Sequence, residues 1–231
     1  LTACGELEES VRTLIALAVL WPTASPTIIF LEENLGATKT QNSLNLALVL
    51  DRSGSMQGAK LDFVKQAAMH VVDLLQEGDQ VAIVAYDDEI QVLSPSFHST
   101  AHKRQELKRL IGHLHTGGST NLGGGWLAGC QEAASAAGEG TLNRALLLTD
   151  GLANVGITDL EELAMHAKQL SRRGVSTSTF GVGLDFNEHL LEAMANAGGG
   201  NYYFIESPLG IPDLFVKEFK ELAAVTARDV E

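Results

Sequence analysis

Residues 44–56 read LNLALVLDRSGSM, an apolar run followed directly by a polar loop. The first seven residues form a nearly uninterrupted apolar run, which is typical of a strand buried on both faces of a parallel sheet. The run ends at Asp51, where a short polar loop with two serines and a glycine begins. Because ligands of such sheets bind beyond the carboxyl ends of the strands, this loop is a candidate functional site.

Downstream, short apolar runs alternate with longer segments whose apolar residues recur at helical spacing. This alternation predicts a doubly wound α/β fold, a mostly parallel sheet with helices on both faces and right-handed crossovers. One antiparallel edge strand is expected, because residues 87–89 read DDE and form a hairpin turn between two apolar runs. The expected strands are residues 44–50, 80–86, 90–93, 145–148, 175–182 and 201–205. The expected helices are residues 60–76, 102–115, 158–173, 187–197 and 211–227, and a small-residue helix that follows the glycine-rich residues 117–125 and runs through residue 137.

The domain organisation follows from where the alternation begins. Residues 1–43 do not fit it, so we expect an N-terminal appendage there and one α/β domain over residues 44–231. The hydrophobic fraction of 45% is ordinary for a globular protein and argues against intrinsic disorder. No apolar run reaches the ~18 residues that a membrane-spanning helix needs.

The charge balance excludes several classes of partner. The 231 residues include 16 basic and 29 acidic side chains, which gives a net charge of −13. This balance argues against nucleic acid and against docking on an anionic lipid surface, and it favours cations. The two cysteines, Cys4 and Cys130, are too few for a disulfide framework or a four-thiolate zinc site. We interpret Cys130 as a small buried residue rather than a reactive thiol.

Polar residues follow the apolar strands at three places. Residues 51–56 read DRSGSM, residues 117–121 read GGSTN, and residues 149–151 read TDG. We expect all three segments to converge on one edge of the sheet. They supply carboxylates and hydroxyls with no sulfur or imidazole, and such an all-oxygen set suits a hard cation such as Mg²⁺. By contrast, His113 and His115 lack a third ligand, and we interpret them as a solvated helix end rather than a zinc site.

These motifs carry a family resemblance. In order, LVLDRSGSM, GGSTN and LLLTDG resemble the metal-ion-dependent adhesion site of a von Willebrand factor type A domain. The resemblance covers roughly residues 44–226. It is strongest to bacterial members similar to calcium-activated chloride channel and inter-alpha-trypsin inhibitor heavy chain proteins, which also carry an NVG segment like residues 154–156. It implies a Rossmann-like fold and a metal held by the hydroxyls of three residues and, directly or through water, by two carboxylates: Ser53, Ser55, Thr120, Asp51 and Asp150.

The resemblance also implies a function. We expect Mg²⁺, with Mn²⁺ or Ca²⁺ as alternatives, and a protein partner whose Asp or Glu carboxylate completes the coordination of the ion. The expected protein is a binding module with no catalytic residues and no small-molecule substrate. In adhesive relatives the last helix shifts on ligation; for residues 211–227 we favour a helix that packs in place, through Leu214, Phe215, Phe219, Leu222 and Val225.

Two other functions are considered. A haloacid-dehalogenase-like phosphotransferase also places an Asp and Mg²⁺ after its first strand, but it needs a general acid two residues later, where this chain has Ser53. A structural scaffold in a larger assembly, with the metal only rigidifying the loops, is the third alternative. The location stays open between two cases: Leu1-Thr2-Ala3-Cys4 resembles a bacterial lipobox, which implies an envelope protein anchored through Cys4, and otherwise the protein is cytoplasmic.

Overall fold

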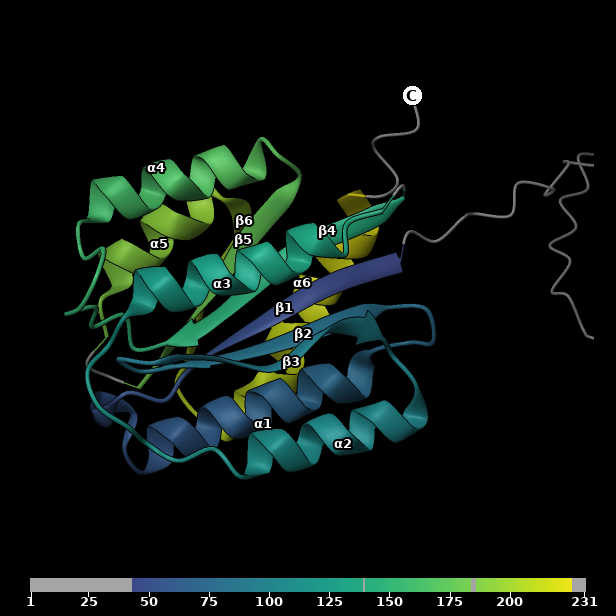
Figure 1. Cartoon of the computed structure of the whole chain (residues 1–231), viewed down its shortest axis with the longest axis horizontal. Coiled ribbons are helices and arrows are strands. Elements are labelled where there is room, and N and C mark those ends of the chain that lie inside the picture. Colours follow the sequence, from purple (N-terminus) through teal and green to yellow (C-terminus); the bar gives the residue numbers. More distant parts are fainter. Residues whose placement is uncertain (1–42, 139, 184–185, 226–231) are drawn as a thin grey trace, which may run out of the picture. The chain divides into compact units, whose positions relative to one another are not determined.

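The computed structural model describes residues 43–138, 140–183 and 186–225. These residues form one six-stranded sheet in the order β3-β2-β1-β4-β5-β6, flanked by six α-helices (Figure 1). Neighbouring strands are parallel except β2 and β3, which form an antiparallel pair. The strands are β1 (Ser43–Asp51), β2 (Gln80–Tyr86), β3 (Ile90–His98), β4 (Thr141–Thr149), β5 (Val175–Val182) and β6 (Gly199–Ile205). The helices are α1 (Ala59–Leu74), α2 (Ala101–Gly112), α3 (Leu122–Ser135), α4 (Leu160–Ser171), α5 (Glu188–Ala197) and α6 (Ile211–Val225).

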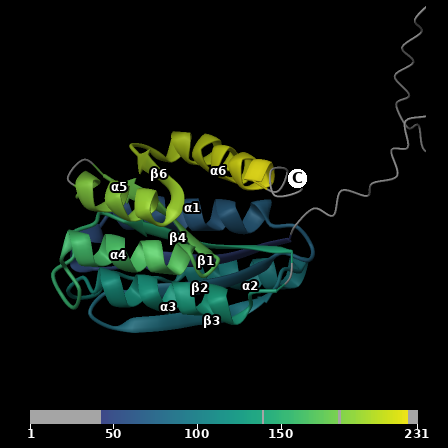
Figure 2. The ribbon, with the colours of Figure 1, turned by 90° about the horizontal axis from the view of Figure 1, so that it is seen from above.

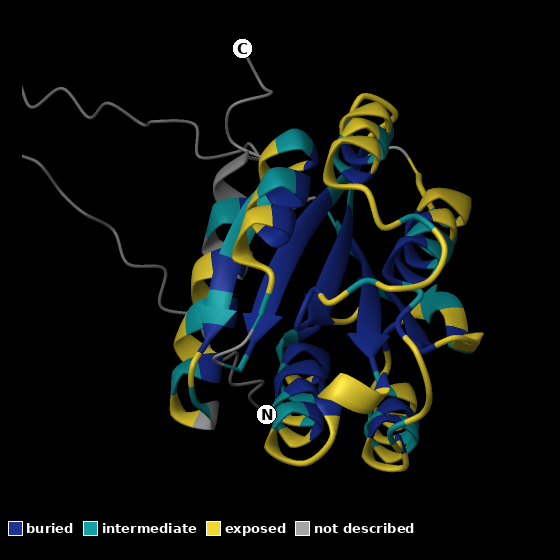
Figure 3. Ribbon diagram, turned by 90° about the vertical axis from the view of Figure 1, so that its left-hand side faces the viewer, coloured by how far each residue is buried: buried dark blue, intermediate teal, exposed yellow. Residues whose placement is uncertain are grey.

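Helices cover both faces of the sheet because successive side chains of a strand point to opposite sides. In β1, Leu46, Leu48 and Leu50 face a core that α1, α2 and α6 cover. Ala47 and Val49 face the other core, which α3, α4 and α5 cover. Figure 2 shows this layering from a second direction, and in Figure 3 the buried strands lie between helices whose outer turns are exposed. The predicted doubly wound α/β class with one antiparallel edge strand is therefore confirmed.

The bounds of several elements differ from the prediction. The strand expected at residues 90–93 extends to His98, although Pro95 lies inside it. The extension is possible because β3 is the edge strand and has no neighbouring strand on its outer side. A proline, which lacks a backbone N–H, therefore costs no hydrogen bond there. The polar and partly exposed residues beyond Leu93 gave no apolar pattern, so the sequence did not predict them as strand.

The glycine-rich segment is partly helical and not wholly a loop. Helix α3 begins at Leu122, so three glycines lie in its first turn. At two positions of α3 only glycine leaves room for the neighbouring strand. A Cβ on Gly125 would lie 2.3 Å from Tyr86 Cγ, and a Cβ on Gly129 would lie 2.2 Å from Val49 Cγ2. The absence of side chains at these positions lets α3 pack closely against the sheet.

Helix α6 is fixed to the sheet by an ion pair that could not be predicted from the sequence. The guanidinium of Arg144 in β4 donates to the Glu218 carboxylate at 2.7 Å, and both side chains are almost fully buried. Ser178 also donates to Glu218 at 2.6 Å. The expected apolar contacts of this helix are present where its side chains are described: Phe215 and Leu222 are buried and Leu214 packs beside them, whereas the side chains of Phe219 and Val225 lie outside the described part.

Residues 226–227 of the expected last helix, Cys4 and nearly all of the expected appendage at residues 1–43 lie outside the described residues; Ser43 opens β1. Within the described ranges, no helix is long and apolar enough to cross a membrane.

Candidate metal centre

The sheet topology places the two expected carboxylates side by side. β1 and β4 are parallel neighbours at the point where the strand order reverses, and their register pairs Leu50 with Leu148. Asp51 is the last residue of β1 and Asp150 directly follows β4, so both lie at the carboxyl edge of the sheet. In Figure 1 the parallel strands run toward the left-hand side, which faces the viewer in Figure 3. This edge is where open α/β sheets bind their ligands.

Asp51 is fully buried and its carboxylate is hydrogen-bonded by three groups. Its Oδ1 accepts from the Ser53 backbone N–H at 2.8 Å. Its Oδ2 accepts from the Thr149 hydroxyl at 2.5 Å and from the Tyr86 hydroxyl at 3.2 Å. Burial raises the pKa of Asp51, the hydrogen bonds from Ser53 and Thr149 oppose that rise, and the neighbouring Asp150 adds to it. The three donors therefore fix the orientation of this carboxylate.

The loop after β1 turns its two serine hydroxyls toward each other. Ser53 Oγ lies 3.1 Å from Ser55 Oγ, and Ser53 is fully buried while Ser55 is exposed. The Gly54 N–H donates to the Gly118 carbonyl at 2.8 Å, and the Gly117 N–H donates to the Arg52 carbonyl at 2.7 Å. These two backbone bonds join the serine loop to the loop that carries Thr120.

The Thr120 loop is anchored on the segment after β4. The Thr120 N–H donates to Asn154 Oδ1 at 2.8 Å, and its carbonyl accepts from the backbone N–H groups of Asn154 and Val155, each at 3.1 Å. Thr120 is buried, at 2% exposure. The NVG segment therefore has a physical role, since its asparagine holds the loop between the first and third motifs.

A second anchor for this loop is Asp87, which follows β2. Its carboxylate accepts from the Arg52 guanidinium at 3.1 Å, from the Glu89 N–H at 2.8 Å and from the Gly118 N–H at 3.3 Å. A Cβ on Gly117 would lie only 1.6 Å from Asp87 Oδ2, so glycine is required for this close approach. Asp87 thus connects the serine loop with the Thr120 loop.

Asp150 carries the one ion pair made by an expected ligand among the described residues. Its Oδ2 accepts from Lys60 Nζ at 2.9 Å, and its Oδ1 accepts from the Leu152 N–H at 3.3 Å. The Asp150 side chain has no exposed surface, whereas that of Lys60 is 23% exposed. Lys60 therefore borders the candidate site from α1.

The donor set fits a hard divalent cation. Four of the five expected ligands are at most 2% exposed, and the fifth, Ser55, lies at the solvent side. Two buried carboxylates with one lysine leave a net negative charge, which a cation would compensate. Among the described residues, no three or more His, Cys, Asp or Glu side chains are grouped so that they could hold a metal ion. The oxygens of serine, threonine and aspartate match Mg²⁺, Mn²⁺ or Ca²⁺ in hardness.

His113, His115 and Cys130, which the sequence excluded as metal ligands, lie away from the candidate site. His113 follows α2, where its Nδ1 lies 2.6 Å from the Arg109 carbonyl, and both His113 and His115 are exposed. Cys130 in α3 is 1% exposed, and burial raises the pKa of its thiol to about 12. Both arrangements agree with the interpretations drawn from the sequence.

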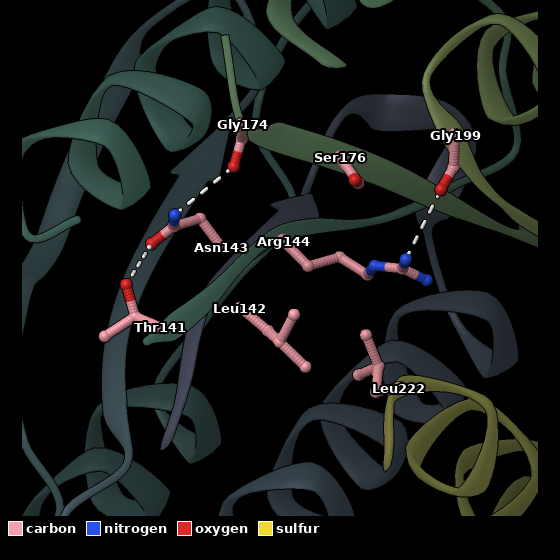
Figure 4. A pocket seen from close by; sticks show the side chains of 8 residues that line it. All are labelled: Thr141, Leu142, Asn143, Arg144, Gly174, Ser176, Gly199 and Leu222. Carbon is pink, nitrogen blue, oxygen red and sulfur yellow. Dashed lines mark hydrogen bonds between the residues drawn. The ribbon is translucent and has the colours of Figure 1, made fainter. Parts of the chain in front are cut away.

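A cavity of about 300 Å³ lies at the opposite edge of the sheet, where β4, β5 and β6 begin (Figure 4). Arg144 borders it, and its guanidinium donates to the Gly199 carbonyl at 3.3 Å. None of the expected metal ligands lines this cavity. The candidate site is therefore formed by loops at the carboxyl edge and not by this cavity.

Comparison with known proteins identifies relatives of most of the chain. A model of the von Willebrand factor type A domain matches residues 45–216. The chain is 35% identical to YfbK of Escherichia coli (strain K12) over 189 residues, which are 81% of this chain and 32% of YfbK. It is 28% identical to inter-alpha-trypsin inhibitor heavy chain H1 of Mesocricetus auratus over 167 residues, which are 70% of this chain and 18% of that protein. The chain thus spans a third or less of the length of these relatives.

Solved structures share the fold. A von Willebrand factor type A protein from Catenulispora acidiphila has a TM-score of 0.65 at 26% identity, covering 80% of this chain and 43% of that chain. Proximal thread matrix protein 1 from the mussel byssus, solved with a zinc-occupied MIDAS motif, has a TM-score of 0.59 at 19% identity, covering 76% of this chain and 46% of that chain. At 19% identity, the second likeness concerns the fold alone.

Proposed function

Because the chain belongs to the von Willebrand factor type A family, we propose that it is a protein-binding module that depends on a divalent metal at the carboxyl edge of its sheet. The observation that carries this proposal is the pair of fully buried carboxylates at the reversal of the strand order. The proposed ligands are two carboxylates and three hydroxyls, from Asp51, Asp150, Ser53, Ser55 and Thr120.

Mg²⁺ is the proposed ion, with Mn²⁺ or Ca²⁺ as substitutes. Mg²⁺ prefers a small number of carboxylates together with neutral oxygens and water. When bound, the ion supplies a hard Lewis-acid position at which a further oxygen can bind. Asp51 is suited to this task because Thr149, Tyr86 and the Ser53 N–H already hold its carboxylate in one orientation.

The charges of the site favour an acidic partner. Asp51 and Asp150 balance the two charges of the ion, and the hydroxyls of Ser53, Ser55 and Thr120 add none. The ion and its ligands from this chain then carry no net negative charge. A carboxylate from an Asp or Glu of the partner protein can therefore bind the ion without being repelled. This arrangement reconciles a chain of net charge −13 with an acidic partner, because the metal lies between them.

No residue of the site is assigned a catalytic role, and no small-molecule substrate is proposed. A phosphotransferase of the haloacid-dehalogenase type needs a general acid at position 53, where the chain offers a hydroxyl that lies 3.1 Å from Ser55 Oγ. A scaffold role would use the same metal only to hold the loops together. These three functions differ in what chelation of the metal releases.

The proposal is tested by affinity capture from source-cell extract with the whole chain as bait. The capture is run in Mg²⁺ and in EDTA, with wild type, Thr120→Val and the control Thr158→Val. The control changes an exposed threonine in the segment between β4 and α4. We expect proteins that wild type and Thr158→Val retain in Mg²⁺, that EDTA releases, and that Thr120→Val does not retain. Equal capture in EDTA by all three proteins, with an unchanged circular dichroism spectrum, would contradict metal-dependent binding and favour the scaffold.

For the location, we propose the cell envelope, with lipid attachment at Cys4 as the anchor. The support is the sequence of residues 1–4 alone. Mass spectrometry of the protein isolated from its source membranes tests the attachment, and an unmodified Cys4 thiol in soluble protein would favour the cytoplasmic alternative.

A further inference from the structure

Lys60 makes an ion pair inside the proposed metal centre. It is the second residue of α1, and its Nζ lies 2.9 Å from Asp150 Oδ2. Arg52, the other basic residue close in sequence to the ligands, pairs with Asp87 instead. Among the described residues, Lys60 is therefore the only basic side chain paired with one of the five proposed ligands.

The fold is shaped to admit this lysine. Gly183 directly follows β5, and a Cβ there would lie 2.7 Å from Lys60 Cε and 3.3 Å from Lys60 Cγ. Its φ of +86° is also one that side chains rarely adopt. The aliphatic part of Lys60 thus packs against Gly183, which has no side chain. Its ammonium pairs with the carboxylate of Asp150, whose side chain has no exposed surface.

The charges give this contact a consequence. Without a metal, Asp51 and Asp150 bring two negative charges into a buried site, and Lys60 compensates one of them. A divalent cation needs the same Asp150 carboxylate, and it must bind next to an ammonium that already neutralises that group. Like charges so close in a partly buried site repel each other strongly.

We propose that Lys60 is the internal counter-ion of the metal-free site and that it limits metal affinity by competing for Asp150. This inference rests on the proposed function, because it concerns the same metal site. In the metal-free protein Lys60 stabilises the buried carboxylate, and on metal binding its ammonium leaves Asp150 Oδ2. The lysine thereby keeps the loops folded in the absence of metal and makes the metal exchangeable.

The proposal is tested with Lys60→Met and the matched control Lys65→Met, which removes the same charge farther along α1, at a lysine for which the structure gives no ion pair. Calorimetric titration with Mg²⁺ should show that Lys60→Met binds about tenfold more tightly than wild type, since a tenfold change corresponds to about 1.4 kcal/mol of relieved repulsion. Lys65→Met should match wild type within about twofold, because Lys65 is only partly buried and the structure gives it no ion pair with a proposed ligand.

Urea unfolding of the same proteins in EDTA and in saturating Mg²⁺ closes the cycle. In EDTA, Lys60→Met should unfold at lower urea than Lys65→Met, because Asp150 has lost its partner. In Mg²⁺ the difference should shrink, because linkage requires the tighter metal binding to reappear as added stability. An equal loss in both conditions, with unchanged or weaker Mg²⁺ affinity, would show a purely structural ion pair and overturn the proposal.

A measurement on wild type covers the case in which Lys60→Met does not fold. The ¹⁵N resonance of the Lys60 ammonium should shift as one equivalent of Mg²⁺ is added, while that of Lys65 stays in place. A Lys60 resonance that does not move while calorimetry shows binding would overturn the counter-ion role and leave the metal site standing. If wild type, Lys60→Met and Lys65→Met all bind no Mg²⁺, the proposed function itself fails.

Discussion

Asp87 provides a sharp test of how the three loops are held, because it is not a proposed ligand and yet joins two of the loops that carry ligands. Its carboxylate is about 6% exposed and accepts from the Arg52 guanidinium and from two backbone N–H groups, at Glu89 and Gly118. The substitution Asp87→Ala removes all three acceptor contacts at once. It also leaves the Arg52 guanidinium without its ion-pair partner.

The expected loss of stability follows from these contacts. A hydrogen bond contributes about 1 kcal/mol net and somewhat more when the acceptor is charged, but the 3.3 Å contact to Gly118 is long. The Arg52 side chain is 19% exposed, so water can replace part of what it loses. The sum is about 3 kcal/mol in the free energy of unfolding. The Thr120 loop also loses one anchor, and we expect Mg²⁺ affinity to fall at least about tenfold.

The assay is urea unfolding followed by circular dichroism, together with calorimetric Mg²⁺ titration. The control is Asp88→Ala, which removes the same charge one residue later at an exposed position and should change stability by no more than about 0.5 kcal/mol. If Asp87→Ala and Asp88→Ala unfold at the same urea concentration and bind Mg²⁺ equally, the reasoning about the loop anchor is refuted.

Three further predictions concern stability, pH and reactivity. Glu218→Leu should lose about 3–5 kcal/mol in urea unfolding because it leaves the Arg144 guanidinium buried without its partner; a loss below about 1 kcal/mol would contradict this. Burial raises the pKa of Asp51 in the folded state above its ordinary value of 3.8. The folded state therefore holds that proton more tightly than the unfolded state. The stability that this group contributes is present at low pH and is lost as pH rises through the raised pKa. Unfolding in EDTA from about pH 4 to about pH 8 should show this decline in wild type and its absence in Asp51→Asn; parallel profiles would contradict it. In a Cys4→Ser protein, the Cys130 thiol should react with an aromatic disulfide reagent only after denaturation, because it is buried and its pKa is raised to about 12; reaction of the folded protein would contradict this.

Most of the fold could be predicted because the strands of a parallel sheet are marked by their composition. The buried run of β1 and the exact bounds of β5 follow from uninterrupted apolar or small residues between turns. The second half of β3 could not be predicted, because an edge strand needs neither a buried face nor an unbroken apolar pattern. Likewise, glycines that begin a helix look like a loop until the helix is seen to approach the sheet at Gly125.

The position of Asp51 and Asp150 could be predicted from the rule that polar residues after neighbouring strands meet at one edge. The residues that hold them are a different matter. Tyr86 and Thr149 end the strands on either side of β1, and that position was a signal that could have identified them as partners of Asp51. Lys60 and Asp87 could not be found this way, because their contacts depend on where a helix and a hairpin turn pack in three dimensions.

The most direct test of the central claim is calorimetric titration of the whole chain with Mg²⁺, beside the variants Asp51→Ala and Asp62→Ala. Asp62 lies exposed on α1, so its loss changes the charge equally without touching the site. We predict one Mg²⁺ per chain for wild type and Asp62→Ala, and no binding by Asp51→Ala while its circular dichroism spectrum remains that of the folded protein. Unchanged Mg²⁺ binding by a folded Asp51→Ala, or no binding by wild type, would contradict the proposed metal centre.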